Sequence, residues 1–276
     1  MKELYNGKIE FVTPSFLAGA NQNRPEVRVS AIRGELRWWF RVLGGTSEEE
    51  NLIFGTVHGS AMSSAIILRV TDVAVKYGDE IKCPAMSDMG YIYYFAQVSG
   101  KRENVHRTFA SHYFAPGTSF RLIVGLRREI DQELENKFRL SLRMFVALGS
   151  LGLRATRGCG AIAEESGMAR NELRDLLSTC EKDLTVRLIG DEAYGSAAKC
   201  QTALGGFLRE FRRKNRLSGK THSALGYSDG RERASSALRL RPVKIGNDFL
   251  PAVIYTDAAC SQPSVWDLVV RETIEI

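Results

Sequence analysis

Apolar residues recur in two spacings along the first half of the chain, and these spacings predict its helices and strands. Helical spacing covers residues 30–43 and 129–148. Short β-branched or aromatic runs predict strands at residues 8–14, 64–73, 91–98, 120–126 and 159–165. The run at 91–98 lies inside a less regular insertion. Without it the order is strand, helix, strand, strand, helix, strand, which is the βαββαβ or ferredoxin-like topology.

The second half of the chain predicts a further set of elements. A helix at residues 169–183 is followed by a strand at 184–190 and a long basic helix around residues 199–216. Strands are then predicted at residues 237–245, 249–256 and 265–270. We therefore predict an α+β protein with two ferredoxin-like domains. The first spans residues 1–165 and carries a glycine-rich loop, and the second, residues 166–276, is a divergent copy.

Composition excludes several classes of protein. Of 276 residues, 44% are hydrophobic and 25% are charged, which is typical of a folded domain with a buried core. No apolar run approaches the ~18 residues that span a bilayer, and the first residues do not resemble a signal peptide, so we expect a cytoplasmic protein without a membrane partner. The five cysteines form no CxxC pair and the four histidines are scattered, so we expect no metal and no cofactor.

Positive charge gathers in one region. Between Gly205 and Lys244 the chain has eleven Lys and Arg against three Asp and Glu, whereas the formal net charge of the whole chain is only +6. A local excess of this kind indicates either a surface that binds a polyanion or a solvated helix face.

The loop at residues 149–162 combines four glycines with Arg154 and Arg157. Glycine lets the backbone approach a ligand closely, and a guanidinium donates two hydrogen bonds to one phosphate. The loop therefore predicts an anion site with Gly158 and Gly160 as amide donors.

The helix at residues 30–43 presents two stripes. Five apolar residues form a core stripe: Ile32, Leu36, Trp39, Phe40 and Leu43. Arg33, Arg37 and Arg41 form a second stripe, and Gly34 and Trp38 lie beyond it. Because glycine costs about 1 kcal/mol inside a helix, Gly34 indicates that a ligand approaches the backbone there. The alternative is that Trp38 packs under the neighbouring insertion and the arginines are only solvated. If both functional interpretations hold, the arginine stripe and the glycine-rich loop form two walls of one groove.

Four segments carry a resemblance. Residues 13–20 read TPSFLAGA, residues 30–41 read SAIRGELRWWFR, residues 53–55 read IFG and residues 236–241 read SALRLR. Together with the glycine-rich loop they resemble the RAMP superfamily of CRISPR proteins, and within it the first-numbered subunits of type III-B (Cmr) effector complexes. The loop lacks the serine and one basic residue that are usual in the family, and Ala237 stands where proline is common.

The resemblance implies a non-catalytic RNA-binding subunit. Such subunits bind the 3′ region of the CRISPR RNA (crRNA), help to capture target RNA, and contact the other RAMP subunits of the complex. No catalytic residue is expected. The expected RNA-binding residues are Arg33, Gly34, Arg37, Trp38, Arg41, Arg154, Arg157, Gly158 and Gly160, with Arg24, Arg28, Arg231, Arg233 and Arg241 as further candidates.

Two other functions remain open at this stage. The chain could be a metal-independent RAMP endoribonuclease that processes CRISPR RNA, with His58 or His112 as the base. It could also be a scaffold whose basic face and Trp38 serve protein contacts only.

Overall fold

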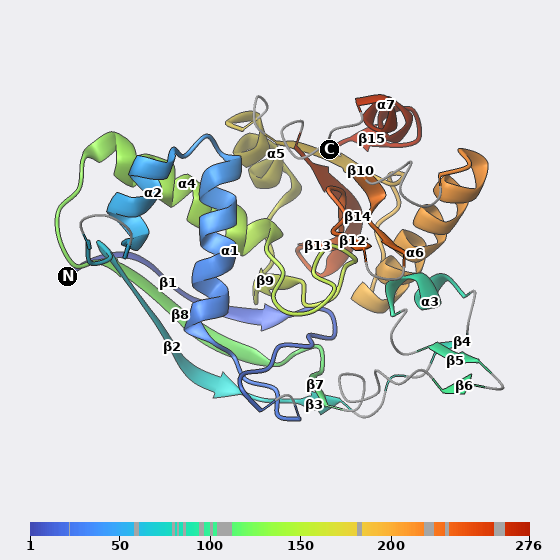
Figure 1. Cartoon of the computed structure of the whole chain (residues 1–276), viewed down its shortest axis with the longest axis horizontal. Helices are drawn as coiled ribbons and strands as arrows, with labels where there is room; N and C mark the ends of the chain where they lie inside the picture. Colours follow the sequence, from blue (N-terminus) through green and yellow to red (C-terminus); the bar gives the residue numbers. More distant parts are fainter. Residues whose placement is uncertain are drawn as a thin grey trace.

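The computed structural model confirms the predicted βαββαβ order of the first unit (Figure 1). It describes residues 1–21, 23–57, 61–78, 81, 83–84, 87–93, 97–99, 102–103, 112–180, 184–217, 224–229, 232–256 and 263–276. The strands β1 (Lys2–Phe11), β2 (Ile66–Ala74), β8 (Ser119–Leu126) and β9 (Ile162–Glu164) form an antiparallel sheet of order β2-β8-β1-β9. The helices α1 (Val29–Val42) and α4 (Gln132–Leu148) pack together against this sheet.

The second unit repeats the same topology. Its strands β10 (Thr185–Leu188), β13 (Arg239–Ile245), β14 (Asp248–Tyr255) and β15 (Ile274–Glu275) pair antiparallel in the order β13-β14-β10-β15. When the four strands of each sheet are numbered in chain order within their own unit, both sheets have the strand order 2-3-1-4. The connecting helices are α6 (Ala197–Lys214) and α7 (Pro263–Arg271), and α5 (Arg170–Ser178) precedes the unit. The predicted pair of ferredoxin-like folds is therefore confirmed, whereas the division at residue 165 stays a prediction.

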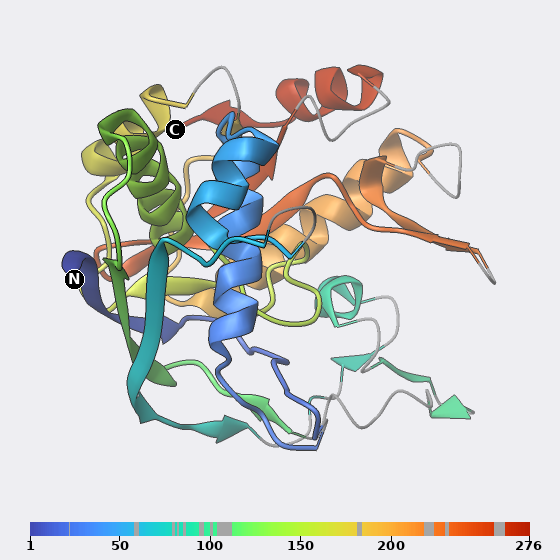
Figure 2. The same cartoon turned by 60° about the vertical axis from the view of Figure 1, so that its left-hand side comes forward.

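The two units share a core. Side chains of β14 alternate between two faces, as the period of a strand requires. Leu250, Ala252 and Ile254 enter a cluster that also contains the buried residues of α1 and α4. Val253 and Tyr255 face a second cluster, formed mainly by α6 and α7. The second sheet is thus covered by its own helices on one face and by the first unit on the other (Figure 2).

Smaller elements complete the chain. They are α2 (Ser47–Phe54), α3 (Asp88–Ile92), β3 (Tyr77–Gly78), β4 (Cys83–Pro84), β5 (Gln97–Ser99), β6 (Arg102–Glu103), β7 (Tyr113–Phe114), β11 (Tyr227–Asp229) and β12 (Glu232–Ala234). Within the part of the chain that the structure describes, no helix combines the length and apolarity needed to cross a bilayer.

One predicted strand is wrong in part and another is wrong throughout. Tyr91 and Ile92, at the start of the predicted strand 91–98, belong to α3, whose N-cap Ser87 accepts a hydrogen bond from the Gly90 amide. Residues 94–96 lie outside the described residues, and Gln97 and Val98 belong to the strand β5. The predicted strand 265–270 belongs to α7, since Val265, Trp266 and Val269 are buried at helical spacing. The β-branched composition of the second segment favoured a strand, but its buried positions follow a period of 3.6.

The helix α2 was not predicted, although its sequence carries a start signal. The Thr46 side chain accepts from the Glu49 amide, and the Glu49 side chain accepts from the Thr46 amide. This reciprocal pair is a capping box, which the T-x-x-E pattern encodes. The arginine stripe of α1 packs against this helix.

Candidate nucleic-acid interface

The helix α1 buries its predicted core stripe and leaves an outer face. All five apolar residues of the stripe are buried. We call the residues on the other side, Arg28, Arg33, Gly34, Arg37, Trp38 and Arg41, the α1 outer face. Gly34 is exposed, and a Cβ added there would meet nothing within 4 Å. No packing contact therefore requires this glycine, and its backbone is open to an approaching ligand.

Two arginines of the stripe hold the end of α2. Arg33 Nη1 donates to the carbonyl oxygen of Phe54 at 3.3 Å, and Arg37 Nη2 donates to that of Gly55 at 3.0 Å. The final carbonyls of a helix lack partners inside the helix, so basic groups stabilise them. Gly55 has φ +80, and a Cβ there would lie 2.7 Å from the Met62 carbonyl oxygen. The RGELR segment of α1 and the IFG segment at the end of α2 are therefore linked: the arginines of the first donate to backbone carbonyls of the second.

The stripe carries more positive than negative charge. Glu50 accepts from Arg41 at 2.5 and 2.9 Å and lies 3.2 Å from Arg37 Nε. Burial, followed by the charges of Arg37 and Arg127, lowers the pKa of Arg33. One carboxylate therefore faces two guanidinium groups. Arg33, Arg37 and Glu50 line a pocket of about 430 Å³ between α1 and the end of α2, and this lining carries more positive than negative charge.

Trp38 connects α1 to the second unit. The guanidinium carbon of Arg239 lies 3.4 Å from the centroid of the indole ring, and Arg239 Nη1 lies 3.0 Å from Glu35 Oε2. Glu35, Trp38 and Arg239 thus form a stacked and charge-paired contact between the two units. One face of the indole therefore packs on Arg239 of β13, whereas the structural alternative expected the insertion as its partner. Part of that insertion lies outside the described residues.

Four of the five further candidates fall into two groups, and the fifth, Arg241, lies at the glycine-rich loop. Arg24 and Arg28 are exposed at the start of α1, where Arg28 is the N-cap residue. Their positions extend the basic character of the α1 outer face toward its N-terminal end. Arg231 lies outside the described residues, and Arg233 lies in β12 with its side chain outside them.

The arginines of the glycine-rich loop contact backbone carbonyls of the protein. Arg154 donates to the carbonyl oxygens of Tyr91 at 2.6 Å and Ile92 at 2.7 Å, at the end of α3. Arg157 is 8% exposed and donates to the Leu225 carbonyl oxygen. Burial, and then the charges of Arg212 and Arg154, lower the pKa of Arg157 to about 9.

Two glycines of the loop are buried, and Gly160 is tightly packed. Gly158 and Gly160 are buried with φ +79 and +62, a region that favours glycine. A Cβ on Gly160 would overlap the Leu151 carbonyl oxygen, and the Gly160 amide donates to the Pro14 carbonyl oxygen at 2.8 Å. Here glycine permits close approach of the protein's own backbone.

Arg241 closes the loop at both ends. Its Nη1 donates to the Gly149 carbonyl oxygen at 2.5 Å and its Nη2 to the Ile162 carbonyl oxygen at 2.7 Å. The side chain is 1% exposed. Burial, together with the charge of Arg239, lowers the pKa of Arg241 to about 9. A buried guanidinium with these partners holds the loop rather than presenting charge to solvent.

The TPSF segment holds the glycine-rich loop near both of its ends. Thr13 Oγ1 accepts from the Ala161 amide at 2.9 Å, and Ser15 Oγ donates to the Leu151 carbonyl oxygen at 2.8 Å. The Leu153 amide donates to the Phe16 carbonyl oxygen at 3.0 Å. Sequence reasoning recognised this segment only through its resemblance, because the contacts join positions that are more than 130 residues apart.

The predicted groove between the arginine stripe and the glycine-rich loop is wrong in its geometry. The stripe faces α2, and the loop runs along the other side of α1 (Figures 1 and 2). The loop instead meets β13, where the Leu240 amide donates to the Thr156 carbonyl oxygen at 3.1 Å. A stripe of arginines on a helix does not by itself show which neighbour it faces.

Arg127 and Arg239 belong to the charged surroundings of α1 and were missed. Arg127 follows β8 in a dibasic pair, and its charge contributes to the lowered pKa of Arg33. Of the two histidines considered as a base, His112 is exposed just before β7 and His58 lies outside the described residues. Among the described residues, no group of three or more His, Cys, Asp or Glu is placed to hold a metal.

We predict that Arg241→Met lowers the free energy of unfolding by about 2–4 kcal/mol, because two buried carbonyl groups lose their donor. Arg241→Lys should recover only part of this loss, since one ammonium cannot reproduce the planar fork. Urea unfolding measures both values. The exposed control Arg143→Met should change stability by less than about 0.5 kcal/mol. Equal stability of the Arg241→Met variant and the wild type would contradict this role.

Comparison with known proteins agrees with the motifs. A family model described as the RAMP superfamily matches residues 8–163. The CRISPR system Cmr subunit Cmr1-1 of Pyrococcus furiosus is 32% identical over 165 residues, which cover 56% of this chain and 46% of that protein. Subunit Cmr1-2 of the same organism is 30% identical over 179 residues, which cover 56% of this chain and 91% of that protein. The match thus spans about half the length of Cmr1-1.

Solved structures show the same fold. The crystal structure of Cmr1 from Pyrococcus furiosus superimposes with a TM-score of 0.61 at 21% identity and covers 91% of this chain and 87% of that chain. A chain of the type III-B Cmr-beta complex, bound to cognate target RNA, gives a TM-score of 0.59 at 14% identity and covers 99% of both chains. The family model covers more than half of the chain, including α1 and the glycine-rich loop, so this protein belongs to the RAMP superfamily.

Proposed function

We propose that this chain is a non-catalytic RNA-binding subunit of a type III-B CRISPR (Cmr) effector complex. In this role it binds the 3′ region of crRNA, helps to capture target RNA, and contacts neighbouring RAMP subunits. Its sequence similarity to the Cmr1-1 and Cmr1-2 subunits supports this assignment. The resemblance of its fold to a Cmr-beta chain in a complex with target RNA agrees with it. The free buried thiols Cys159, Cys180 and Cys200 suit the reducing cytoplasm.

The surplus of positive charge on the α1 outer face is the observation that carries the proposal. Arg37 and Arg41 share Glu50, whereas Arg33 donates to the Phe54 carbonyl oxygen. Gly34 leaves the helix backbone beside these arginines open. Arg24 and Arg28 continue the charge toward the N-terminal end of the helix. Guanidinium groups along an open helix face bind phosphates regardless of base identity. This surface therefore fits a guide RNA whose sequence varies.

The buried arginines have a different role in this proposal. Arg157 and Arg241 donate to backbone carbonyls, and the amide of Gly160 donates to the Pro14 carbonyl oxygen. We assign them, with Gly158, to holding the glycine-rich loop in place. Trp38 fixes α1 against the second unit and borders the RNA-binding surface on that side.

Gly34 allows a test that leaves every existing contact in place. Because the position is open, Gly34→Glu and Gly34→Gln both fit, and both should stabilise the helix by several tenths of a kcal/mol. We predict that Gly34→Glu weakens binding of single-stranded RNA several-fold more than Gly34→Gln does, with the difference shrinking as salt increases. Fluorescence anisotropy of labelled RNA measures both. Equal affinities of the two variants would argue against this surface.

The arginines themselves should account for part of the salt dependence. We predict that Arg33→Ala combined with Arg41→Ala weakens binding of every RNA sequence and reduces the slope of log K against log salt by about 1.4, or about 0.7 for each phosphate that no longer meets a guanidinium. The charge-matched control is Lys199→Ala with Arg271→Ala, on exposed positions of α6 and α7. If the control pair reduces the slope as much as the α1 pair, RNA binding depends on the total positive charge of the protein and not on the α1 outer face.

The non-catalytic role makes a separate prediction. Purified protein incubated with CRISPR repeat RNA in EDTA should leave the RNA intact, because α1 supplies no histidine. Gel analysis of the RNA after long incubation measures this. Metal-independent cleavage that disappears in the His112→Ala or His58→Ala variant would instead establish the endoribonuclease function.

A further inference from the structure

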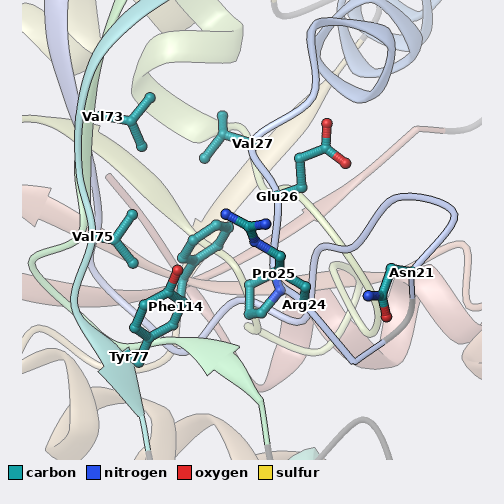
Figure 3. A pocket seen from close by; sticks show the side chains of 9 residues that line it. All are labelled: Asn21, Arg24, Pro25, Glu26, Val27, Val73, Val75, Tyr77 and Phe114. Carbon is teal, nitrogen blue, oxygen red and sulfur yellow. The ribbon is translucent and has the colours of Figure 1, made fainter.

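A second concave site lies at the N-terminal end of α1. It is a pocket of about 590 Å³ between the segment that precedes α1 and the strand that follows β2. Its size is within the range of about 300–1,000 Å³ that is usual for small-ligand sites. Figure 3 shows Tyr77, Val75 and Val73 along one wall, with Arg24, Pro25 and Val27 opposite. None of the sequence motifs points to this pocket.

The walls combine exposed apolar surface with one cation, Arg24, and one carboxylate, Glu26. Tyr77 is 63% exposed, Val73 44% and Val75 39%, which is unusual for three large apolar side chains on one strand end. The guanidinium of Arg24 extends into the space between the walls (Figure 3). Unpaired bases stack on aromatic rings such as the phenol of tyrosine and on the planar guanidinium of arginine.

The protein holds both walls in place. Tyr77 pairs with Phe114 across β3 and β7, and the buried Phe114 exchanges backbone hydrogen bonds of 3.0 Å with Ser15. On the other wall, the Glu26 amide donates to the Leu17 carbonyl oxygen at 2.9 Å. Both walls are therefore attached to the segment that follows β1. A preformed slot of this kind binds a planar group with little ordering cost.

The pocket is continuous with the α1 outer face. Val27 lines the pocket and the next residue, Arg28, is the N-cap of α1. From Arg28 to Arg33 the helix rises by only about 7.5 Å. An RNA strand that follows the arginines toward the start of α1 arrives at the slot. Such a strand brings phosphates as well as bases, so it supplies an anion for the guanidinium of Arg24 while a base covers the apolar strand end.

We propose that this slot holds one nucleobase of single-stranded RNA, stacked between Tyr77 and the guanidinium of Arg24. The proposal rests on the proposed function, because the same strand is held by the α1 outer face. It adds a base-stacking residue, Tyr77, to a surface that otherwise contacts phosphates. Stacking on an aromatic ring tolerates every base, so it keeps the independence from guide sequence.

The test uses the full chain and an oligouridine RNA of about ten nucleotides, a length comparable to other single-stranded RNA sites. Tyr77→Ala should weaken binding about tenfold without changing the salt slope, because no charge is removed. Tyr77→Phe retains the ring and should bind within about twofold of the wild type. The control Val270→Ala, at an exposed apolar position of α7, should have no effect.

Crosslinking locates the base directly. Oligouridine containing 5-iodouridine, irradiated in complex with the protein, should attach to the peptide that contains Tyr77, and Tyr77→Ala should abolish this product. If Tyr77→Ala binds like the wild type while Gly34→Glu binds weakly, the base slot is overturned and the proposed function stands. If Tyr77→Ala impairs only assembly with co-expressed subunits, the pocket is a protein contact. If the wild type binds no RNA, both proposals fail.

Discussion

The guanidinium of Arg241 fixes the geometry on which the rest of the structure depends. It lies where both units meet and donates to the carbonyl oxygens at the two ends of the glycine-rich loop. Burial lowers the pKa of Arg241 to about 9. The guanidinium is therefore still charged at neutral pH, and a charged donor makes stronger hydrogen bonds than a neutral one. Since Arg239 is two residues earlier on β13, the same anchoring brings Arg239 over Trp38 and sets the orientation of α1.

The arginines of this chain therefore divide into two groups. Arg157 and Arg241 are buried, have protein carbonyls as partners and hold the loop. Arg37 and Arg41 share one carboxylate and Arg33 donates to a backbone carbonyl, on a helix that is open at Gly34. In a buried site the desolvation of a guanidinium must be offset by fixed acceptors, whereas on an open surface the charge remains available for phosphate. The two roles are therefore distinguished by whether the arginine side chain is buried, and not by whether the arginine belongs to a recognised motif.

The sequence predicts the first unit well because its core stripes and strands are local patterns. Ile32, Leu36 and Trp39 repeat at helical spacing and are buried as expected. The second unit is predicted less completely: Val265 and Val269 are β-branched yet belong to a helix, because their burial against the second sheet outweighs their strand propensity. At the site, the exposed Gly34 is a local signal. The partners of Arg241 lie 79 and 92 residues away, and no local pattern encodes them.

The central claim is that RNA lies on the α1 outer face while the glycine-rich loop supports the fold from within. Hydroxyl-radical footprinting of the protein, alone and with bound crRNA, tests this most directly. We expect RNA to protect peptides spanning residues 28–41, whereas residues 157–160 are already protected without RNA and do not change. Protection by RNA that is confined to the glycine-rich loop, with residues 28–41 unaffected, would contradict the claim.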